Sequence, residues 1–173
     1  MHHHEQRKPG YAALRRHRWS AAGAEYFVTT KLRRPGSGLH EPQLIGQLEA
    51  QRIRLEAEGV WRVRSWVVMP DHVHLVMTLG EGASLQECVR LFKGRLSPSL
   101  RNQNLQWQDG FHEHRLRSDE DRLPVFLYLF FNPHRAGLIT GYETWPGYYC
   151  SPEDWKWFEP LTRASVPFPE WIE

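Results

Sequence analysis

The chain has 173 residues, a length that suits one domain with its own hydrophobic core. Hydrophobic residues make up 40% of it and charged residues 24%, a balance that argues against wholesale disorder. Its apolar stretches are shorter than the ~18 residues that a membrane-spanning helix needs, and two cysteines are too few for a disulfide framework. No apolar stretch follows the basic N-terminus to act as a secretory signal, so we expect a cytoplasmic protein.

The formal net charge of +2 hides an asymmetry along the chain. Residues 140–173 hold two basic and six acidic side chains, which leaves residues 1–139 with a net charge of +6. The basic residues are mostly arginines in clusters, such as LRRHRW at 14–19 and KLRRP at 31–35. Clustered guanidinium groups suit phosphate oxygens, so the distribution permits a nucleic-acid partner, but a solvated surface explains it equally well.

Hydrophobic periodicity predicts the order strand, helix, strand, strand, helix, strand, helix. Strands are expected at 25–32, 60–70, 72–79 and 111–117, and helices at 42–58, from the capping pattern Ser84-x-x-Glu87 onward, and at 119–131. The residue before a proline avoids the α conformation, so Asn132-Pro133 is expected to end or kink the last helix. The order predicts an α+β fold, a ferredoxin-like antiparallel four-stranded sheet with helices on one face.

The stretch VVMPDHVHLVM at 67–77 places His72 and His74 two residues apart in an apolar strand. Alternate residues of a strand share a face, so both imidazoles emerge on the same side of the sheet. They could bind a divalent metal ion together, or they could be a polar surface pair. Asp71 lies at odd spacing from this pair, which favours a role in the turn over a role as a third ligand.

Tyr128 and Asn132 are four residues apart in the last predicted helix, so they share one helix face. The phenol of Tyr128 and the amide of Asn132 would then point to the same side of the helix. Each residue also has an ordinary interpretation, Tyr128 as a core aromatic beside Phe126 and Phe130, and Asn132 as a helix stop before Pro133.

Three stretches taken together resemble one family: WVVMPDHVHLVMTL at 66–79, FHEHRLRSDED at 111–121 and YLFFNPHRAGLI at 128–139. They are similar to the signature blocks of single-tyrosine HUH transposases, and most similar to the REP-associated tyrosine transposase branch. RRHRWSAAGAEYFVTTKLRRP at 15–35 and WPGYY at 145–149 extend the similarity. The resemblance implies an HUH endonuclease-type domain at 20–150. A basic arm at 1–19 precedes it, and an acidic, Trp- and Pro-rich tail at 151–173 follows it.

The resemblance implies a metal-dependent single-stranded DNA endonuclease and strand transferase, that is, a transposase. Tyr128 would match the nucleophile, and His72, His74 and Asn132 would match the ligands of Mg²⁺ or Mn²⁺. Attack by the phenolate would leave a 5′-phosphotyrosine and a free 3′-OH, and the reverse attack would join a different 3′ end. Asn132 stands where the insertion-sequence branch often has glutamine, and His134 stands where a small aliphatic residue is common.

The REP-associated branch acts on imperfect hairpins with a flanking tetranucleotide, so hairpin or single-stranded DNA is the expected partner. The branch is expected to act as a monomer near the bacterial nucleoid, whereas insertion-sequence relatives form dimers. Trp19 and Trp107 could stack on bases, or they could belong to the core. The candidate phosphate contacts are Arg15, Arg16, Arg18, Arg33, Arg34 and Lys93.

Two other functions are compatible with the sequence. A domesticated transposase could bind DNA hairpins without cleaving them, although both histidines, Tyr128 and Asn132 are all present. An unrelated metallohydrolase could use the His-x-His pair, but such folds place further His or Asp ligands just downstream, where LVMTLGEGAS supplies none.

Overall fold

The computed structural model describes residues 22–36, 38–117 and 122–163. Five strands form one antiparallel sheet in the order β4-β1-β3-β2-β5. The elements are β1 (Glu25–Lys31), α2 (Pro42–Ala57), β2 (Trp61–Val68), β3 (His72–Leu79), α3 (Leu85–Asn102), β4 (His112–Leu116), α4 (Leu123–Arg135), β5 (Tyr148–Cys150), α5 (Pro152–Phe158) and a 3-10 turn (Glu159–Leu161). None of the helices in the described ranges combines the length and the apolar character needed to cross a bilayer.

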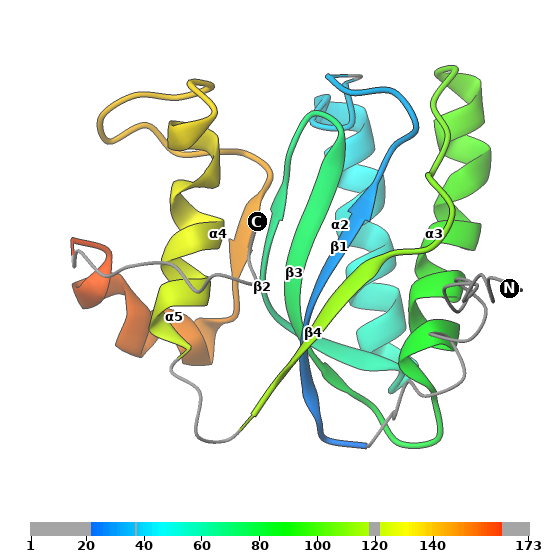
Figure 1. Ribbon diagram of the computed structural model, residues 1–173, viewed down its shortest axis with the longest axis horizontal. Helices are drawn as coiled ribbons and strands as arrows, with labels where there is room; N and C mark the ends of the chain where they lie inside the picture. Colours follow the sequence, from blue (N-terminus) through cyan, green and yellow to red (C-terminus); the bar gives the residue numbers. More distant parts are fainter. Residues whose placement is uncertain (1–21, 37, 118–121, 164–173) are drawn as a thin grey trace, which may run out of the picture.

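The sheet separates two hydrophobic layers, with α2 and α3 on one side and α4 and α5 on the other (Figure 1). Residues such as Val28, Val73 and Leu75 point toward α2 and α3. Their strand neighbours, such as Phe27 and Val76, point toward α4. Because successive side chains of a strand point to opposite faces, β1 and β3 each supply both layers.

The predicted α+β fold is confirmed, with two differences. The four expected strands form in ferredoxin-like order, and α2 and α3 share one face. A fifth strand, β5, pairs with β2 from Ser65 to Val67 and widens the sheet. Helices lie on both faces and not on one, because β1, β2 and β3 carry apolar side chains on both sides and α4 covers the second side.

Local sequence patterns predict the bounds of several elements closely. The β3 strand has the predicted bounds, and the capping pattern forms as expected, with Glu87 N donating to Ser84 Oγ at 3.1 Å. α4 departs from its prediction, because it runs Leu123–Arg135 and Pro133 lies inside it. Pro133 has no N–H to donate within the helix, but the helix continues past it, and Ala136 N donates to Asn132 O at 3.0 Å. Asn132 therefore stays on the helix that carries Tyr128. The acidic residues expected to open this helix, at 119–121, lie outside the described residues.

The first part of the predicted tail, 151–163, packs on the second layer. Phe158 is fully buried there, and Asp154 is 1% exposed. The Asp154 carboxylate accepts hydrogen bonds from Arg64 Nε of β2 at 2.6 Å and from Trp157 Nε1 at 3.0 Å. Burial alone would raise the pKa of Asp154, but the hydrogen bonds from Arg64, Ser151 and Trp157 outweigh it and lower that pKa. Residues 164–173 lie outside the described part of the chain.

Removal of the Asp154 carboxylate is expected to destabilise the protein. Asp154→Ala should lower the free energy of unfolding by about 2–3 kcal/mol, because it leaves the mostly buried Arg64 guanidinium without its main partner. The pKa of Asp154 is lower in the folded state, so its contribution is present at neutral pH and is lost as the pH falls below about 4. Urea unfolding at pH 7 and pH 3 measures both effects.

Glu153→Ala is the matched control for this prediction, because Glu153 pairs with Arg62 (2.5 Å) while both side chains are more than half exposed. Its removal should cost about 0.5 kcal/mol or less. Similar losses in the two variants would contradict the importance of the buried pair.

Candidate active site

His72 and His74 lie on the face of β3 that α4 covers, as strand alternation predicts. Their ring centroids are 4.5 Å apart, with His74 7% exposed and His72 partly exposed. β3 runs between β1 and β2, so its backbone is hydrogen-bonded on both sides. A central strand holds two side chains in a more constant geometry than a loop does.

Each histidine has its Nδ1 atom next to an oxygen of a neighbouring side chain. Thr29 Oγ1 lies 2.7 Å from His74 Nδ1, and Asp71 Oδ1 lies 2.6 Å from His72 Nδ1. Histidines that bind metal ions have this arrangement, because a partner on one ring nitrogen fixes the tautomer and leaves the other nitrogen for the ion. In both rings the atom left for a ligand is Nε2.

Both histidines have a lowered pKa. Burial lowers the pKa of His72, and the Asp71 carboxylate offsets only part of that effect. Burial holds the pKa of His74 well below its usual range, and the nearby charges of His72, Lys31 and Arg135 add to it. Both rings are therefore mostly neutral at pH 7, which is the form that binds a metal ion.

Tyr128 approaches the histidine pair from α4. Its Oη lies 3.4 Å from His74 Nε2, and its ring packs edge-on against Phe27 with centroids 6.2 Å apart. The guanidinium carbon of Arg135 lies 4.2 Å from the centroid of the Tyr128 ring, close enough for a cation–π contact. The structure thus brings the predicted nucleophile and a predicted metal ligand together, although they are 54 residues apart in sequence.

Asn132 lies one turn beyond Tyr128 on α4 and is 6% exposed. With the Nε2 atoms of His72 and His74, its amide oxygen would give two nitrogen ligands and one oxygen ligand. Neutral, pre-oriented imidazoles together with an amide oxygen fit a first-row divalent ion. Within the described ranges, no three His, Cys, Asp or Glu side chains gather into a metal site. The candidate set differs, because its third member is the amide of Asn132.

Sequence reasoning missed the side chains that surround the histidines. Thr29 faces His74 and Lys31 faces His72 in the register between β1 and β3. Directly opposite residues on neighbouring strands lie on one face, so only the pairing of β1 with β3 identifies them. Asp71 lies in the turn, as the sequence predicts, but the sequence does not predict its contact with His72. Strand alternation does not govern a residue that precedes the strand.

The candidate phosphate contacts within the described residues, Arg33, Arg34 and Lys93, differ in their surroundings. Arg33 is exposed and pairs with Asp109 at 3.4 Å, and Arg34 is also exposed. Lys93 is engaged within the fold, since its Nζ donates to the backbone carbonyls of Gln108 (2.5 Å) and Gly110 (2.7 Å). Trp107 is 6% exposed and packs in the α2/α3 layer, so its core interpretation is confirmed. The remaining candidates, Arg15, Arg16, Arg18 and Trp19, lie outside the described residues.

Known proteins share both the sequence pattern and the fold. Residues 42–117 match a family model described as "Transposase IS200 like", a stretch that includes both histidines and ends before Tyr128. The REP-associated tyrosine transposase of Escherichia coli K12 is 28% identical over 130 residues, which cover 75% of this chain and 78% of that relative. A solved structure of a REP-associated tyrosine transposase bound to a REP hairpin matches with a TM-score of 0.66 and 26% identity, over 87% of this chain and 86% of that one. The chain thus resembles the IS200-like transposases in sequence and REP-associated tyrosine transposases in sequence and fold.

A further relative comes from a second bacterium. A candidate REP-associated tyrosine transposase of Haemophilus influenzae is 31% identical over 113 residues, which cover 51% of this chain and 62% of the relative. The resemblance found in the three sequence stretches is thereby confirmed at the level of the family. The roles of individual residues in this chain rest on the geometry above.

The Thr29 hydroxyl is expected to matter for metal binding. Thr29→Val removes the group next to His74 Nδ1, and loss of such a partner lowers metal affinity by about 10- to 100-fold. Titration with Mn²⁺ by calorimetry measures the change. Thr30→Val is the matched control, because Thr30 is buried on the opposite face and its Oγ1 has no hydrogen-bond partner among the described residues. Unchanged Mn²⁺ affinity in Thr29→Val would contradict the assignment.

Proposed function

We propose that this protein is a metal-dependent single-stranded DNA endonuclease and strand transferase that acts on hairpin DNA through a 5′-phosphotyrosine intermediate. The observation that carries the proposal is the 3.4 Å approach of Tyr128 Oη to His74 Nε2. A tyrosine that served only to fill the core would have no need to place its hydroxyl at a pre-oriented imidazole pair. The hairpin bound by the structural relative supports hairpin DNA as the substrate class.

His72, His74 and Asn132 are the residues that would hold Mg²⁺ or Mn²⁺. Bound there, a divalent ion would supply Lewis-acid polarisation of a phosphate oxygen. The two rings are mostly neutral at pH 7, and Thr29 and Asp71 already fix their orientation. They therefore lose few protons and little rotational freedom when they bind an ion.

Tyr128 would attack the phosphorus in line with the departing 3′ oxygen. A bond forms between Tyr128 Oη and phosphorus, and the bond from phosphorus to the 3′ oxygen breaks. The phenol proton passes to solvent, and the departing oxygen takes up a proton to become a 3′ hydroxyl. Because the phosphoester is preserved, attack by a second 3′ hydroxyl reverses the step and joins new ends.

Two cations next to the site would stabilise the charge of this reaction. Lys31 lies opposite His72 in the register of β1 and β3, and Arg135 packs on the Tyr128 ring. In-line phosphoryl transfer spreads negative charge over the phosphate oxygens and the attacking phenolate. Fixed positive groups at that position lower the barrier, since they need no rearrangement during the reaction.

A second candidate is a hairpin-binding protein that keeps this fold without cleaving DNA. The observation that favours it is the burial of Tyr128, which is only 9% exposed. A DNA phosphate must displace some of the side chains that cover Tyr128 before it can reach the Tyr128 hydroxyl. The complete set of His72, His74, Tyr128 and Asn132 favours the cleaving enzyme.

Covalent trapping separates the two candidates. Incubation with 5′-labelled and 3′-labelled single-stranded hairpins and Mn²⁺ should give a protein-linked band that carries the 3′-labelled fragment. Tyr128→Phe, His72→Ala and EDTA should each abolish that band on denaturing gels. Tyr142→Phe is the matched control and should leave it unchanged, since Tyr142 is 96% exposed. Tight hairpin binding without any adduct would support the binding-only protein.

Arg135 is expected to affect the rate of the covalent step more than DNA affinity. Arg135→Ala should slow adduct formation by about tenfold, because a cation–π contact near a desolvated tyrosine is worth on the order of 1–2 kcal/mol. Arg135→Lys should restore little of the rate, since lysine lacks the planar group that stacks on the ring. Single-turnover kinetics measure these rates, with the exposed Arg54 on α2 changed to Ala as control. A wild-type rate in Arg135→Ala would exclude the role.

A further inference from the structure

The turn between β2 and β3, residues 69–71, orients one of the candidate metal ligands. The Asp71 carboxylate lies 2.6 Å from His72 Nδ1. A carboxylate accepts hydrogen bonds, so this contact places the ring proton on Nδ1 and leaves the lone pair on Nε2, the atom assigned to the ion. The direction of the Asp71 side chain follows from the backbone of the turn. Whatever holds the turn therefore also sets the availability of His72 Nε2.

Hydrogen-bond donors from distant segments hold this turn in place. A hairpin turn needs only its own closing bond, here from Met69 N to His72 O at 2.8 Å, and loop carbonyls usually face water. Three further donors reach carbonyls in and next to the turn: Leu32 N to Asp71 O (2.7 Å), Leu39 N to Pro70 O (2.8 Å) and Trp145 Nε1 to Val68 O (2.7 Å). The turn lies at the upper end of the sheet in Figure 1, between the segment that follows β1 and the loop that leads into β5.

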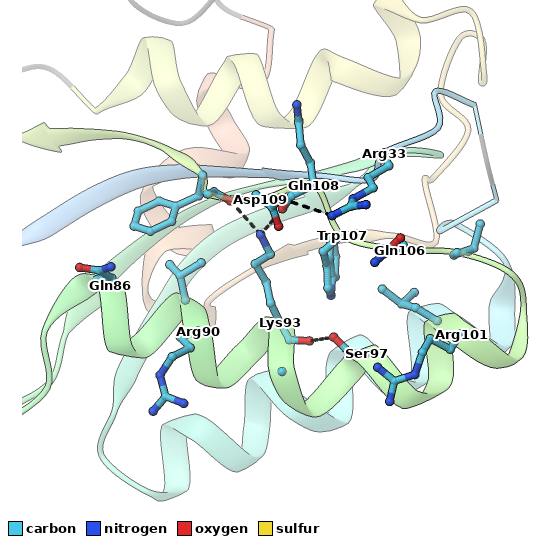
Figure 2. Close-up of a pocket in the computed structure, with 16 residues that line it drawn as sticks. Arg33, Gln86, Arg90, Lys93, Ser97, Arg101, Gln106, Trp107, Gln108 and Asp109 are labelled. Carbon is cyan, nitrogen blue, oxygen red and sulfur yellow. Dashed lines mark hydrogen bonds and ion pairs between the residues drawn. The ribbon is translucent and has the colours of Figure 1, made fainter. Parts of the chain in front are cut away.

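The two backbone donors belong to well-packed segments. Leu32 forms a β-bridge with Trp107. Figure 2 shows Lys93 reaching from α3 to the same segment, where its Nζ donates to the Gln108 carbonyl at 2.5 Å. Leu39 is fully buried in the α2/α3 layer. These donors are main-chain groups on a firm support, so they remain when the side chains around the turn are changed.

Trp145 supplies its donor from a side chain, at the point where β5 ends. The paired register of β2 with β5 stops one residue before Val68, and the indole takes the Val68 carbonyl. Gly147 permits this approach, because a Cβ there would lie 2.7 Å from Val68 O and 2.9 Å from Trp145 Nε1. The indole also stacks on His40, with ring centroids 5.8 Å apart and planes 15° apart. His40 follows Leu39, so the stack joins the side-chain donor to one of the backbone donors.

We propose that Trp145 is a positioning residue for His72. By holding Val68 O, its indole N–H keeps the turn in the arrangement that places Asp71 on His72 Nδ1. Val68 is fully buried, so without this donor its carbonyl would lack a partner and the end of β2 would shift to regain one. The inference rests on the proposed function for the role of His72 as a metal ligand. It adds to the site a side chain that acts through the backbone of the turn.

The position of the ring proton tests the inference without any metal. The pKa of His72 is lowered, so at pH 8 the ring is neutral and its ¹⁵N resonances show which nitrogen carries the proton. The wild-type protein should be protonated on Nδ1. Trp145→Phe keeps a ring for His40 but removes the N–H, and it should give a mixture that includes the Nε2-protonated form.

Trp61→Phe is the matched control. It also removes an indole N–H that donates to a backbone carbonyl, that of Arg52 at 3.2 Å, but Trp61 lies at the opposite end of β2. Its His72 resonances should equal those of the wild-type protein. Equal changes in the two variants would indicate a general loss of packing and would overturn the inference. Wild-type resonances in Trp145→Phe would overturn it too.

A double-mutant cycle in Mn²⁺ affinity gives a second measurement. Loss of a direct partner of a metal-binding histidine lowers affinity by about 10- to 100-fold, which is the loss expected for Asp71→Ala. Trp145→Phe acts one step further away and should lower affinity about three- to tenfold. The double variant should bind Mn²⁺ as Asp71→Ala does, because Trp145 acts through Asp71. Additive losses, measured by calorimetry, would overturn the inference.

The inference and the proposed function fail in different ways. A wild-type protein that bound no Mn²⁺ would contradict the proposed function, while the resonances of the metal-free protein would still decide the inference. If Trp145→Phe does not fold, His40→Ala takes its place, because it keeps the indole N–H and removes only the ring stacked on it. His40→Ala should shift the His72 resonances in the same direction but less. Wild-type resonances in that variant would then overturn the inference.

Discussion

The strict alternation of side chains along β3 is the constraint on which the rest of the molecule depends. Val73, Leu75 and Met77 face the α2/α3 layer, while His72 and His74 face α4. A slip of one residue in the pairing of β3 would turn both imidazoles toward the apolar α2/α3 layer, away from their partners. It would also turn the valine and leucine side chains toward α4. Burial of polar rings without partners is costly, so the hydrophobic layer on one face enforces the geometry of the site on the other.

The second half of the site comes from α4, and it depends on packing across the sheet. Val125, Phe126 and Leu129 are almost fully buried and anchor this helix over the strands. Tyr128 is carried by the same turn, so the apolar residues that attach the helix also set the position of its hydroxyl. The continuation of α4 past Pro133 keeps Asn132 and Arg135 on the helix near that tyrosine. Tyr128 and Asn132 on α4 and the histidine pair on β3 thus belong to different rigid elements, which side-chain packing holds together.

The sequence predicts most of the local structure, but much less of the structure that depends on the pairing of strands distant in sequence. The bounds of β3, the cap at Ser84 and the shared face of the two histidines follow from period and composition alone. β5 is only three residues long, too short for a period to show, and the face that α4 covers depends on a connection that local patterns do not describe. Thr29 and Lys31 join the site through the register of β1 against β3, which no single stretch of sequence contains. The sequence predicts too early an end for α4, because the bias of a residue before proline against the α conformation is a weak preference, and the last helical turn tolerates it.

The edges of the sheet have a consequence for behaviour in concentrated solution. β4, at one edge, is five residues long and carries His112, Glu113, His114 and Arg115, while β5 at the other edge pairs over three residues only. A strand from a second molecule would gain few backbone hydrogen bonds at either edge and would meet charged side chains at the first. Short, charged edges of this kind oppose edge-to-edge polymerisation. The sheet is thereby protected from aggregation by the brevity and charge of its outer strands.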